Sequence, residues 1–358
     1  MISVYIHIPF CNRICTYCDF CKLLKVDAWV NDYLVSLEKE IKSLYRGEEV
    51  KTLYIGGGSP SCLNIEQLKK LFDVLSIFKF TSNCEITFEA NSGDLTLEKL
   101  LFLKDKVNRL SIGIETFNKK YLKLMGRDLN VLNIKAAKKY FDNINIDLMY
   151  NFDLQNTLEL KEDLKKILEL DVPHISAYSL IIEPHTKLFI ECYKETTDDK
   201  MDRFVSDVLK RNGYNHYEIS NYCKKGYESK HNLVYWDNDN YYGFGLGASG
   251  YIDNVRYDNT RNIKEYLKGK YLREKHTLDL NETLQNEFIL GFRKLAGINK
   301  KKFYEKYGFD IHKITVLNNL ISDKMICENK DSVYINPDYL YVSNEILLKF
   351  FDEDLLKH

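Results

Sequence analysis

The sequence predicts an α/β chain in which a mostly parallel β/α unit is followed by a smaller C-terminal domain. Over the first half, short runs rich in β-branched and aromatic residues alternate with amphipathic stretches of helical period, without hairpin turns between them. From about Asn281 the pattern changes to short helices and one hairpin. Strand–helix alternation predicts a parallel sheet. Right-handed crossovers would curl it into a full or partial β/α barrel with active-site loops at the C-terminal strand ends.

Six strands carry this prediction. They are expected at 3–8, 51–58, 84–91, 109–116, 144–150 and 174–182, with helices between them that include 28–45 and about 65–78. A partial barrel of the (β/α)6 type is therefore expected over 1–230, with a cysteine-bearing loop at 9–21. A connecting segment with aromatic-rich runs follows over 231–280. The last part, 281–358, is expected to be an α+β, winged-helix-like domain whose hairpin is "MICENKDSVYINP".

Composition and charge bear on the partners and the cellular location that can be expected. Lys+Arg number 51 and Asp+Glu number 52, so the net charge gives no reason to expect a nucleic-acid partner. The N-terminus lacks the pattern of a signal peptide, and no apolar run approaches the ~20 residues of a membrane span. We therefore expect a cytoplasmic protein with reduced thiols, which disfavours disulfides.

Four of the nine cysteines, Cys11, Cys15, Cys18 and Cys21, lie together after the first strand. A disulfide knot, a four-thiolate zinc site and an iron–sulfur cluster are the alternatives. The C-x3-C-x2-C spacing is unusual for zinc, which favours two paired knuckles from separate segments. Three thiolates on one loop can hold three irons of a cubane and leave the fourth open to a small chelating ligand. Cys21 could instead complete a zinc site.

Other polar residues lie at or near the ends of the expected strands. "GGGSP" (56–60) closes the second strand, and three glycines there would let a bulky cofactor approach the backbone. Glu89, Glu115 and Asp147 follow on later strands. Each has an ordinary alternative: the glycines could serve only the turn, and the acids could be solvated loop residues. Their shared position at one barrel edge favours a common site.

Many motifs in order resemble one branch of the radical S-adenosylmethionine (SAM) proteins. This branch holds the oxygen-independent coproporphyrinogen III dehydrogenases and the HemW haem chaperones. The resemblance covers almost the entire chain through "YIHIPFCNRICTYCDF", "TLYIGGGSPSCL", "EITFEAN", "NRLSIGIETFN", "GRDLN", "DLMY", "HISAYSLIIEP", "YEISNY", "HNLVYW", "GFGLGASG" and "EFILGF".

The resemblance implies a [4Fe–4S] cluster held by Cys11, Cys15 and Cys18, with SAM on its fourth iron. It assigns a SAM pocket of Tyr5, Gly57, Gly58, Ser59, Glu89, Glu115, Arg127, Asp147 and Ser249. Three of the chain's departures from the family concern Cys21, Glu115 and Ser249. Cys21 lies three residues after Cys18, where the dehydrogenases have a gap of two. Glu115 replaces a usual glutamine, and Ser249 replaces the histidine of the chaperones.

Two functions follow from the resemblance. A dehydrogenase would use a 5′-deoxyadenosyl radical to decarboxylate coproporphyrinogen III, whereas a chaperone would bind haem and deliver it to an acceptor protein. The absent N-terminal segment, the displaced fourth cysteine and "HNLVYW" favour the chaperone.

His231 is the expected axial haem ligand, since imidazole commonly ligates haem iron, and Tyr235 and Trp236 would pack on the porphyrin. The alternative is a hydrogen-bonded structural histidine. The C-terminal domain is expected to act as a lid or docking surface. An electron donor such as a flavodoxin or ferredoxin is the further expected partner, and a homodimer is left open.

Overall fold

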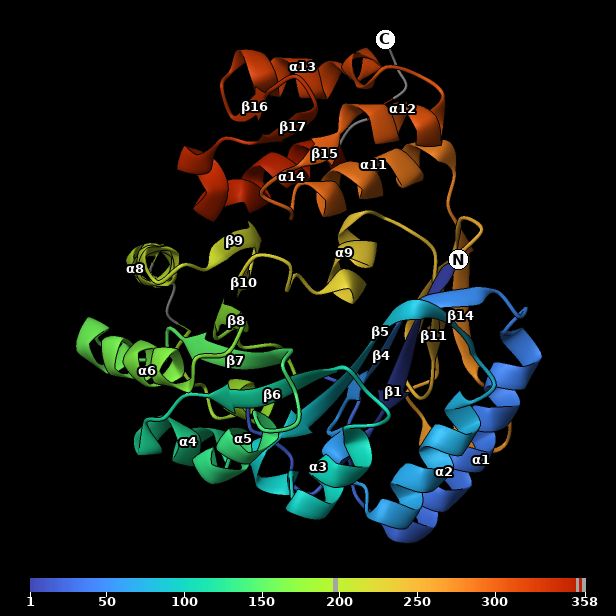
Figure 1. The fold of residues 1–358 in the computed structure, drawn as a ribbon. Helices are drawn as coiled ribbons and strands as arrows, with labels where there is room; N and C mark the ends of the chain where they lie inside the picture. Colours follow the sequence, from blue (N-terminus) through green and yellow to red (C-terminus); the bar gives the residue numbers. More distant parts are fainter. Residues whose placement is uncertain (196–198, 352–353, 356–358) are drawn as a thin grey trace.

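One sheet of twelve strands organises the chain in the computed structural model, which describes residues 1–195, 199–351 and 354–355 (Figure 1). Its order is β14-β13-β12-β11-β1-β4-β5-β6-β7-β8-β10-β9. The six expected strands form its parallel centre: β1 (Ile2–Ile8), β4 (Glu49–Gly57), β5 (Lys79–Asn91), β6 (Arg109–Glu115), β7 (Ile144–Tyr150) and β8 (His174–Ser179). The parallel α/β prediction is confirmed. Because β14 and β9 end the order, the described sheet is an open, partial barrel.

Helices cover the outer face of the parallel strands (Figure 1). They are α1 (Asp27–Leu44), α2 (Ile65–Leu75), α3 (Leu97–Leu103), α4 (Lys119–Met125), α5 (Val131–Ala137), α6 (Thr157–Leu170) and α8 (Asp199–Arg211). The short helix α7 (Lys187–Ile190) lies beside the cysteine loop instead, because the Leu188 N–H donates to the Thr16 carbonyl. N-terminal capping explains where α2 and α6 begin, since Asn64 and Asn156 each form a capping box with the side chain three residues later.

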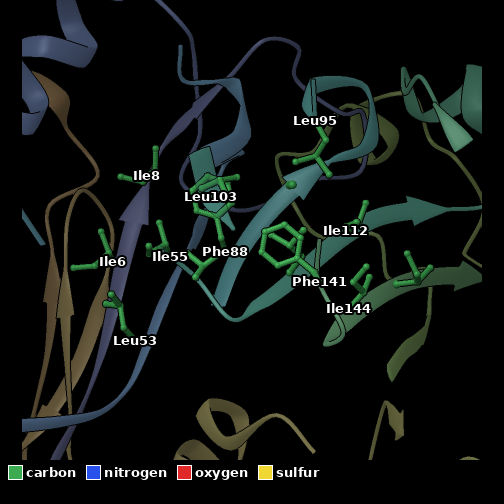
Figure 2. Close-up of a cluster of buried hydrophobic side chains, with 14 of the residues drawn as sticks. Ile6, Ile8, Leu53, Ile55, Phe88, Leu95, Leu103, Ile112, Phe141 and Ile144 are labelled. Atoms are coloured by element: carbon green, nitrogen blue, oxygen red, sulfur yellow. The ribbon is translucent and has the colours of Figure 1, made fainter. Parts of the chain in front are cut away.

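The hydrophobic core lies between the sheet and these helices. Ile6, Ile8, Ile55 and Phe88 belong to it and are fully buried (Figure 2). Side chains alternate between the two faces of a strand, so the residues between these apolar positions point to the barrel interior. Those residues are polar, as the run Ser3, Tyr5 and His7 on β1 illustrates. The sequence pattern therefore places a polar interior behind the mouth of the barrel.

The segment 231–280, expected to connect the barrel to the C-terminal domain, contributes four strands to the sheet. After α9 (Lys230–Trp236), β11 (Tyr241–Phe244) pairs in parallel with β1. Then β12 (Ser249–Ile252), β13 (Val255–Asn259) and β14 (Leu272–Thr277) extend the sheet antiparallel, with α10 (Ile263–Leu267) between the last two. At the other edge lie β9 (Asn215–Glu218) and β10 (Asn221–Cys223).

The C-terminal part has its own hydrophobic cluster, from Leu284 to Leu355. It contains α11 (Leu280–Gly291), α12 (Lys300–Tyr307), α13 (Thr315–Ser322), α14 (Ser343–Phe351) and a sheet of β15 (Ile298–Asn299), β17 (Ser332–Ile335) and β16 (Ile326–Glu328). The antiparallel pairing of β16 with β17 is the expected hairpin.

Two backbone hydrogen bonds join this part to the barrel. The Ile219 N–H donates to the Arg293 carbonyl at 2.9 Å, and the Leu295 N–H donates to the Tyr217 carbonyl at 3.1 Å. In Figure 1 the C-terminal part lies at the top, above α9, β9 and β10. Within the described residues, no helix has the length and apolarity to cross a membrane.

Candidate functional site

A cavity of about 450 Å³ opens at the C-terminal ends of the parallel strands. Ten of the residues that the sequence assigned to a site line it: Cys11, Cys15, Cys18, Gly57, Gly58, Ser59, Glu89, Glu115, Arg127 and Asp147. They come from the cysteine loop, from β4 to β7 and from the segment after α4. The barrel topology therefore gathers residues that lie far apart in the chain around one space.

The cysteine loop is closed at its base by a small parallel pair, β2 (Phe10–Cys11) and β3 (Leu23–Leu24). The Lys25 N–H donates to the Cys11 carbonyl at 2.9 Å, which fixes the two ends of the loop side by side. The Cys21 side chain packs against Gly247 outside the cavity lining, because a Cβ added at Gly247 would lie 2.6 Å from the Cys21 Cβ. Cys21 is thus separated from the three cysteines that face the cavity.

His7 supports the cysteine loop from below. Its Nε2 lies 2.7 Å from the Cys21 carbonyl oxygen, and its Nδ1 lies 2.9 Å from the Tyr5 hydroxyl. A carbonyl only accepts, so Nε2 carries the proton and Nδ1 accepts from Tyr5. Burial lowers the pKa of His7 to about 4, which keeps the ring neutral. Tyr5, which does not line the cavity, therefore acts on the loop through His7.

Gly57 and Gly58, in the turn after β4, line the cavity and also lie in close contact with other parts of the chain. Gly57 has φ +115°, and a Cβ there would lie 2.7 Å from the His7 ring. A Cβ at Gly58 would lie 2.7 Å from the Pro9 carbonyl oxygen and 2.9 Å from the Cys11 Sγ. The expectation that close cofactor approach alone requires these glycines is therefore incomplete, because Gly57 first makes room for His7.

Glu115 and Arg127 form a buried ion pair in the cavity wall. Their oxygen and nitrogen lie 2.9 Å apart, and the side chains are only 5% and 11% exposed. The Tyr17 hydroxyl donates to Glu115 Oε1 at 3.2 Å, and Arg127 Nη1 lies 3.6 Å from the Cys15 Sγ. The extra negative charge of Glu115 thus balances the guanidinium beside the cysteine loop.

Two further carboxyls lie in the same wall. The Glu89 oxygens accept from the Tyr54 hydroxyl at 2.7 Å and from the Gly57 N–H at 3.0 Å, and Asp147 accepts from the Asn145 amide at 2.7 Å. Burial raises the pKa of Glu89 and of Glu115 to about 7 and also raises the pKa of Asp147. A cationic ligand in the cavity would favour their ionised forms.

The residues present fit a cluster and SAM. Burial raises the pKa of the Cys11 thiol to about 12, and metal binding would replace the protons of such thiols. No group of three Cys, His, Asp or Glu side chains in the described part of the chain could hold a single metal ion. Glu115 Oε2 has no hydrogen bond in spite of its ion pair, which leaves a buried acceptor for a ligand amine or hydroxyl. Three thiols on one wall match the ligands of a cluster.

Two of the predicted site residues lie elsewhere. Ser249 is exposed on β12 and donates to Asp258. His231 is 1% exposed on α9 and does not line the cavity. Its Nδ1 lies 2.8 Å from the Thr52 hydroxyl and its Nε2 lies 2.8 Å from the Tyr235 hydroxyl. Both ring nitrogens of His231 therefore have hydrogen-bond partners. This is the arrangement expected of a hydrogen-bonded structural histidine, the alternative to a haem ligand.

The sequence analysis missed several lining residues, including Asn91, Ser111, Gly113, Tyr178 and Arg261. Asn91 receives a hydrogen bond from Arg127 Nη2 at 2.7 Å. The alternation of side chains along a strand would have found two of them. Asn91 follows Glu89 by two residues and Gly113 precedes Glu115 by two, so each shares a face with a predicted residue. Arg261 comes from a loop that no such signal identifies.

Comparisons with known proteins show which proteins the chain is similar to. Residues 5–169 match the family described as the Radical SAM superfamily. The chain is 37% identical to the "Heme chaperone HemW" of Lactococcus lactis subsp. lactis (strain IL1403), over 99% of this chain and 98% of that protein. It is 39% identical to the protein of the same name from Bacillus subtilis (strain 168), over 99% and 100% of the two chains.

A solved structure shares the fold. The structure titled "Coproporphyrinogen III oxidase (HemN) from Escherichia coli is a Radical SAM enzyme" superposes with a TM-score of 0.84, covering 98% of this chain and 89% of its own. The sequence identity is 21%, so the match shows a shared fold and no more.

Proposed function

This chain belongs to the HemW family within the radical SAM superfamily, and from this premise we propose that it is a haem chaperone that binds haem and transfers it to an acceptor protein. The similarity extends over 99% of this chain and 98% or more of the two relatives, so the proposal draws on the whole of the given chain. The acceptor is a haem-requiring protein.

The observation that carries the chaperone proposal is the similarity to the HemW proteins over almost the whole chain, and the cavity that unites the three cysteines with the proposed SAM residues supports the cofactors. Cys11, Cys15 and Cys18 would hold the [4Fe–4S] cluster, and Glu89, Glu115, Arg127 and Asp147 would line the SAM pocket. When bound, the two cofactors would supply one-electron chemistry at the barrel mouth. The chain's own residues would orient them: His7 fixes the end of the cysteine loop, and Arg127 holds a positive charge beside Cys15.

Further partners belong to the same proposal. A cluster of this type needs an electron donor such as a flavodoxin or ferredoxin. We also propose a cytoplasmic location, where the nine cysteines would stay reduced. The second candidate activity, oxidative decarboxylation of coproporphyrinogen III, is supported by the fold shared with HemN and by the same cavity.

Anaerobic reconstitution with iron and sulfide tests both functions on one sample. We expect about four irons per chain, saturable binding of hemin, and no conversion of coproporphyrinogen III in the presence of SAM and a reductant. Cys15→Ala should lose most of the iron, and Cys21→Ala is the matched control that should keep it. Turnover of coproporphyrinogen III would establish the dehydrogenase instead, and a wild-type chain that binds no hemin would refute the chaperone.

A further inference from the structure

A haem chaperone needs a group that can reach the haem iron, and the histidines can be compared on this basis. The sequence has eight, of which His358 lies outside the described residues. Four are buried, and each has at least one ring nitrogen within hydrogen-bond distance of another group: His7, His174, His216 and His231. Two are exposed but pair with a carboxylate, His276 with Glu282 and His312 with Glu328.

His185 differs from all of these. It is exposed in the loop between β8 and α7, and the structure gives its ring no hydrogen bond or ion pair among the described residues. No other described histidine combines exposure with a free ring. An imidazole of this kind is available to a metal without breaking an existing contact.

The surroundings of His185 are apolar and exposed. Ile181 is 61% exposed, Phe189 is 51% exposed and Ile190 is 71% exposed. Thr186 caps α7 by accepting from the Phe189 N–H, so His185 occupies the position before the cap. The side chain at that position commonly packs beside the fourth helical residue, which here is Ile190. Exposed apolar residues grouped in one short segment indicate a binding surface.

This segment also forms part of the cavity mouth. Ile181 and Glu183 line the cavity, and the Thr186 hydroxyl donates to the Glu183 carbonyl at 2.7 Å, which turns the chain tightly between them. On the other side, the Leu188 N–H donates to the Thr16 carbonyl at 3.0 Å, within the cysteine loop. Leu188 itself is buried in a cluster with Met125 and Phe152. The segment is therefore anchored to the loop while its outer side chains remain free.

The backbone at His185 has a positive φ, as it has at nine other described residues that are not glycine. Its φ is +71°, in the left-handed region that favours glycine.

We propose that His185 is the axial ligand of haem and that the segment 181–190 is the apolar surface on which the porphyrin lies, at the mouth of the cavity. This assignment rests on the proposed function and replaces His231 in the role of ligand. It also places the haem beside the cysteine loop, because Leu188 ties the two together.

Hemin titration of the full-length, reconstituted chain tests the assignment. His185→Ala and His185→Gly should both shift the Soret band and weaken hemin binding about tenfold or more, because the iron loses its imidazole. Added imidazole should restore the wild-type spectrum in His185→Gly. The glycine variant suits the backbone at this position, so a folding defect would not explain its loss of binding.

Two variants serve as controls. One changes a residue close to the site, and the other removes the histidine of the competing assignment. Cys192→Ala, two residues beyond α7, should leave the Soret band unchanged, and so should His231→Ala if its circular dichroism shows a folded chain. A wild-type Soret band and affinity in both His185 variants would overturn the proposal and leave the chaperone function standing. Loss of binding in Cys192→Ala or His231→Ala alone would overturn it as well. A wild-type chain that binds no hemin would refute the chaperone function and the ligand together.

Discussion

Replacement of Gly57 by alanine should damage the support of the cysteine loop as well as any cofactor pocket. The new Cβ would lie 2.7 Å from two atoms of the His7 ring, far inside normal contact. The φ of +115° is also outside the range that alanine adopts easily. Since His7 donates to the Cys21 carbonyl, a displaced ring would release that end of the loop.

The cost divides into two parts of similar size. Backbone strain at such a φ costs about 1–3 kcal/mol. Forcing a methyl group against a packed ring costs about 1–3 kcal/mol more. Gly57→Ala should therefore lower the free energy of unfolding by about 2–6 kcal/mol. His7→Ala removes the clash but not the strain, so the double variant should be less destabilised than the sum of the single variants, by about 1–3 kcal/mol.

Urea unfolding of the reduced, ligand-free chain measures the free energy of unfolding of the four proteins in this double-mutant cycle: wild type, Gly57→Ala, His7→Ala and the double variant. Iron content after anaerobic reconstitution is the second measurement, and it should fall in Gly57→Ala and in His7→Ala. Additivity within about 0.5 kcal/mol would show that Gly57 and His7 do not compete for space. Full iron loading of Gly57→Ala would show that the loop does not depend on the ring. Either result would refute the reasoning.

Two other predictions concern stability. Burial raises the pKa of Glu40 from 4.5 to about 7, so its protonated form stabilises the folded chain at low pH, and this contribution is lost as the pH rises through that interval. Glu40→Gln should match wild type near pH 4.5 and exceed its free energy of unfolding by about 3 kcal/mol above pH 7; a less stable variant there would contradict this. His185→Gly should be more stable than wild type by about 0.5–1 kcal/mol in urea, because it removes the strain at φ +71°, and equal midpoints would show that there is little strain.

The parallel strands were predictable because each one is a short run of apolar and β-branched residues followed by a helical pattern. The expected ranges 84–91, 109–116 and 144–150 fall on β5, β6 and β7. The cysteine loop and the carboxyls were predictable for a related reason, since parallel strands bring their C-terminal ends to one edge.

What the sequence did not reveal depends on contacts between distant segments. The "NYYGFGLGASGYI" stretch contains β11 and β12, but its glycines break the strand pattern, and its pairing with β1 has no local signal. His231 shows that the role of a single residue can also depend on contacts with distant segments. Beside two aromatics it suggests a haem ligand, yet Thr52 on β4 and Tyr235 occupy its two nitrogens. Only the fold brings Thr52 to it.

The place of β11 in the sheet has a consequence for biosynthesis. The Gly245 N–H donates to Glu40, 205 residues earlier, and Leu246 donates to the Tyr33 hydroxyl, which in turn donates to the His7 carbonyl. The cysteines leave the ribosome long before β11 and the residues after it are synthesised, about 10–40 s earlier at ordinary rates of translation. The nascent cysteine loop therefore lacks these contacts, and a cluster held by it would reach its final surroundings only when synthesis has passed β11.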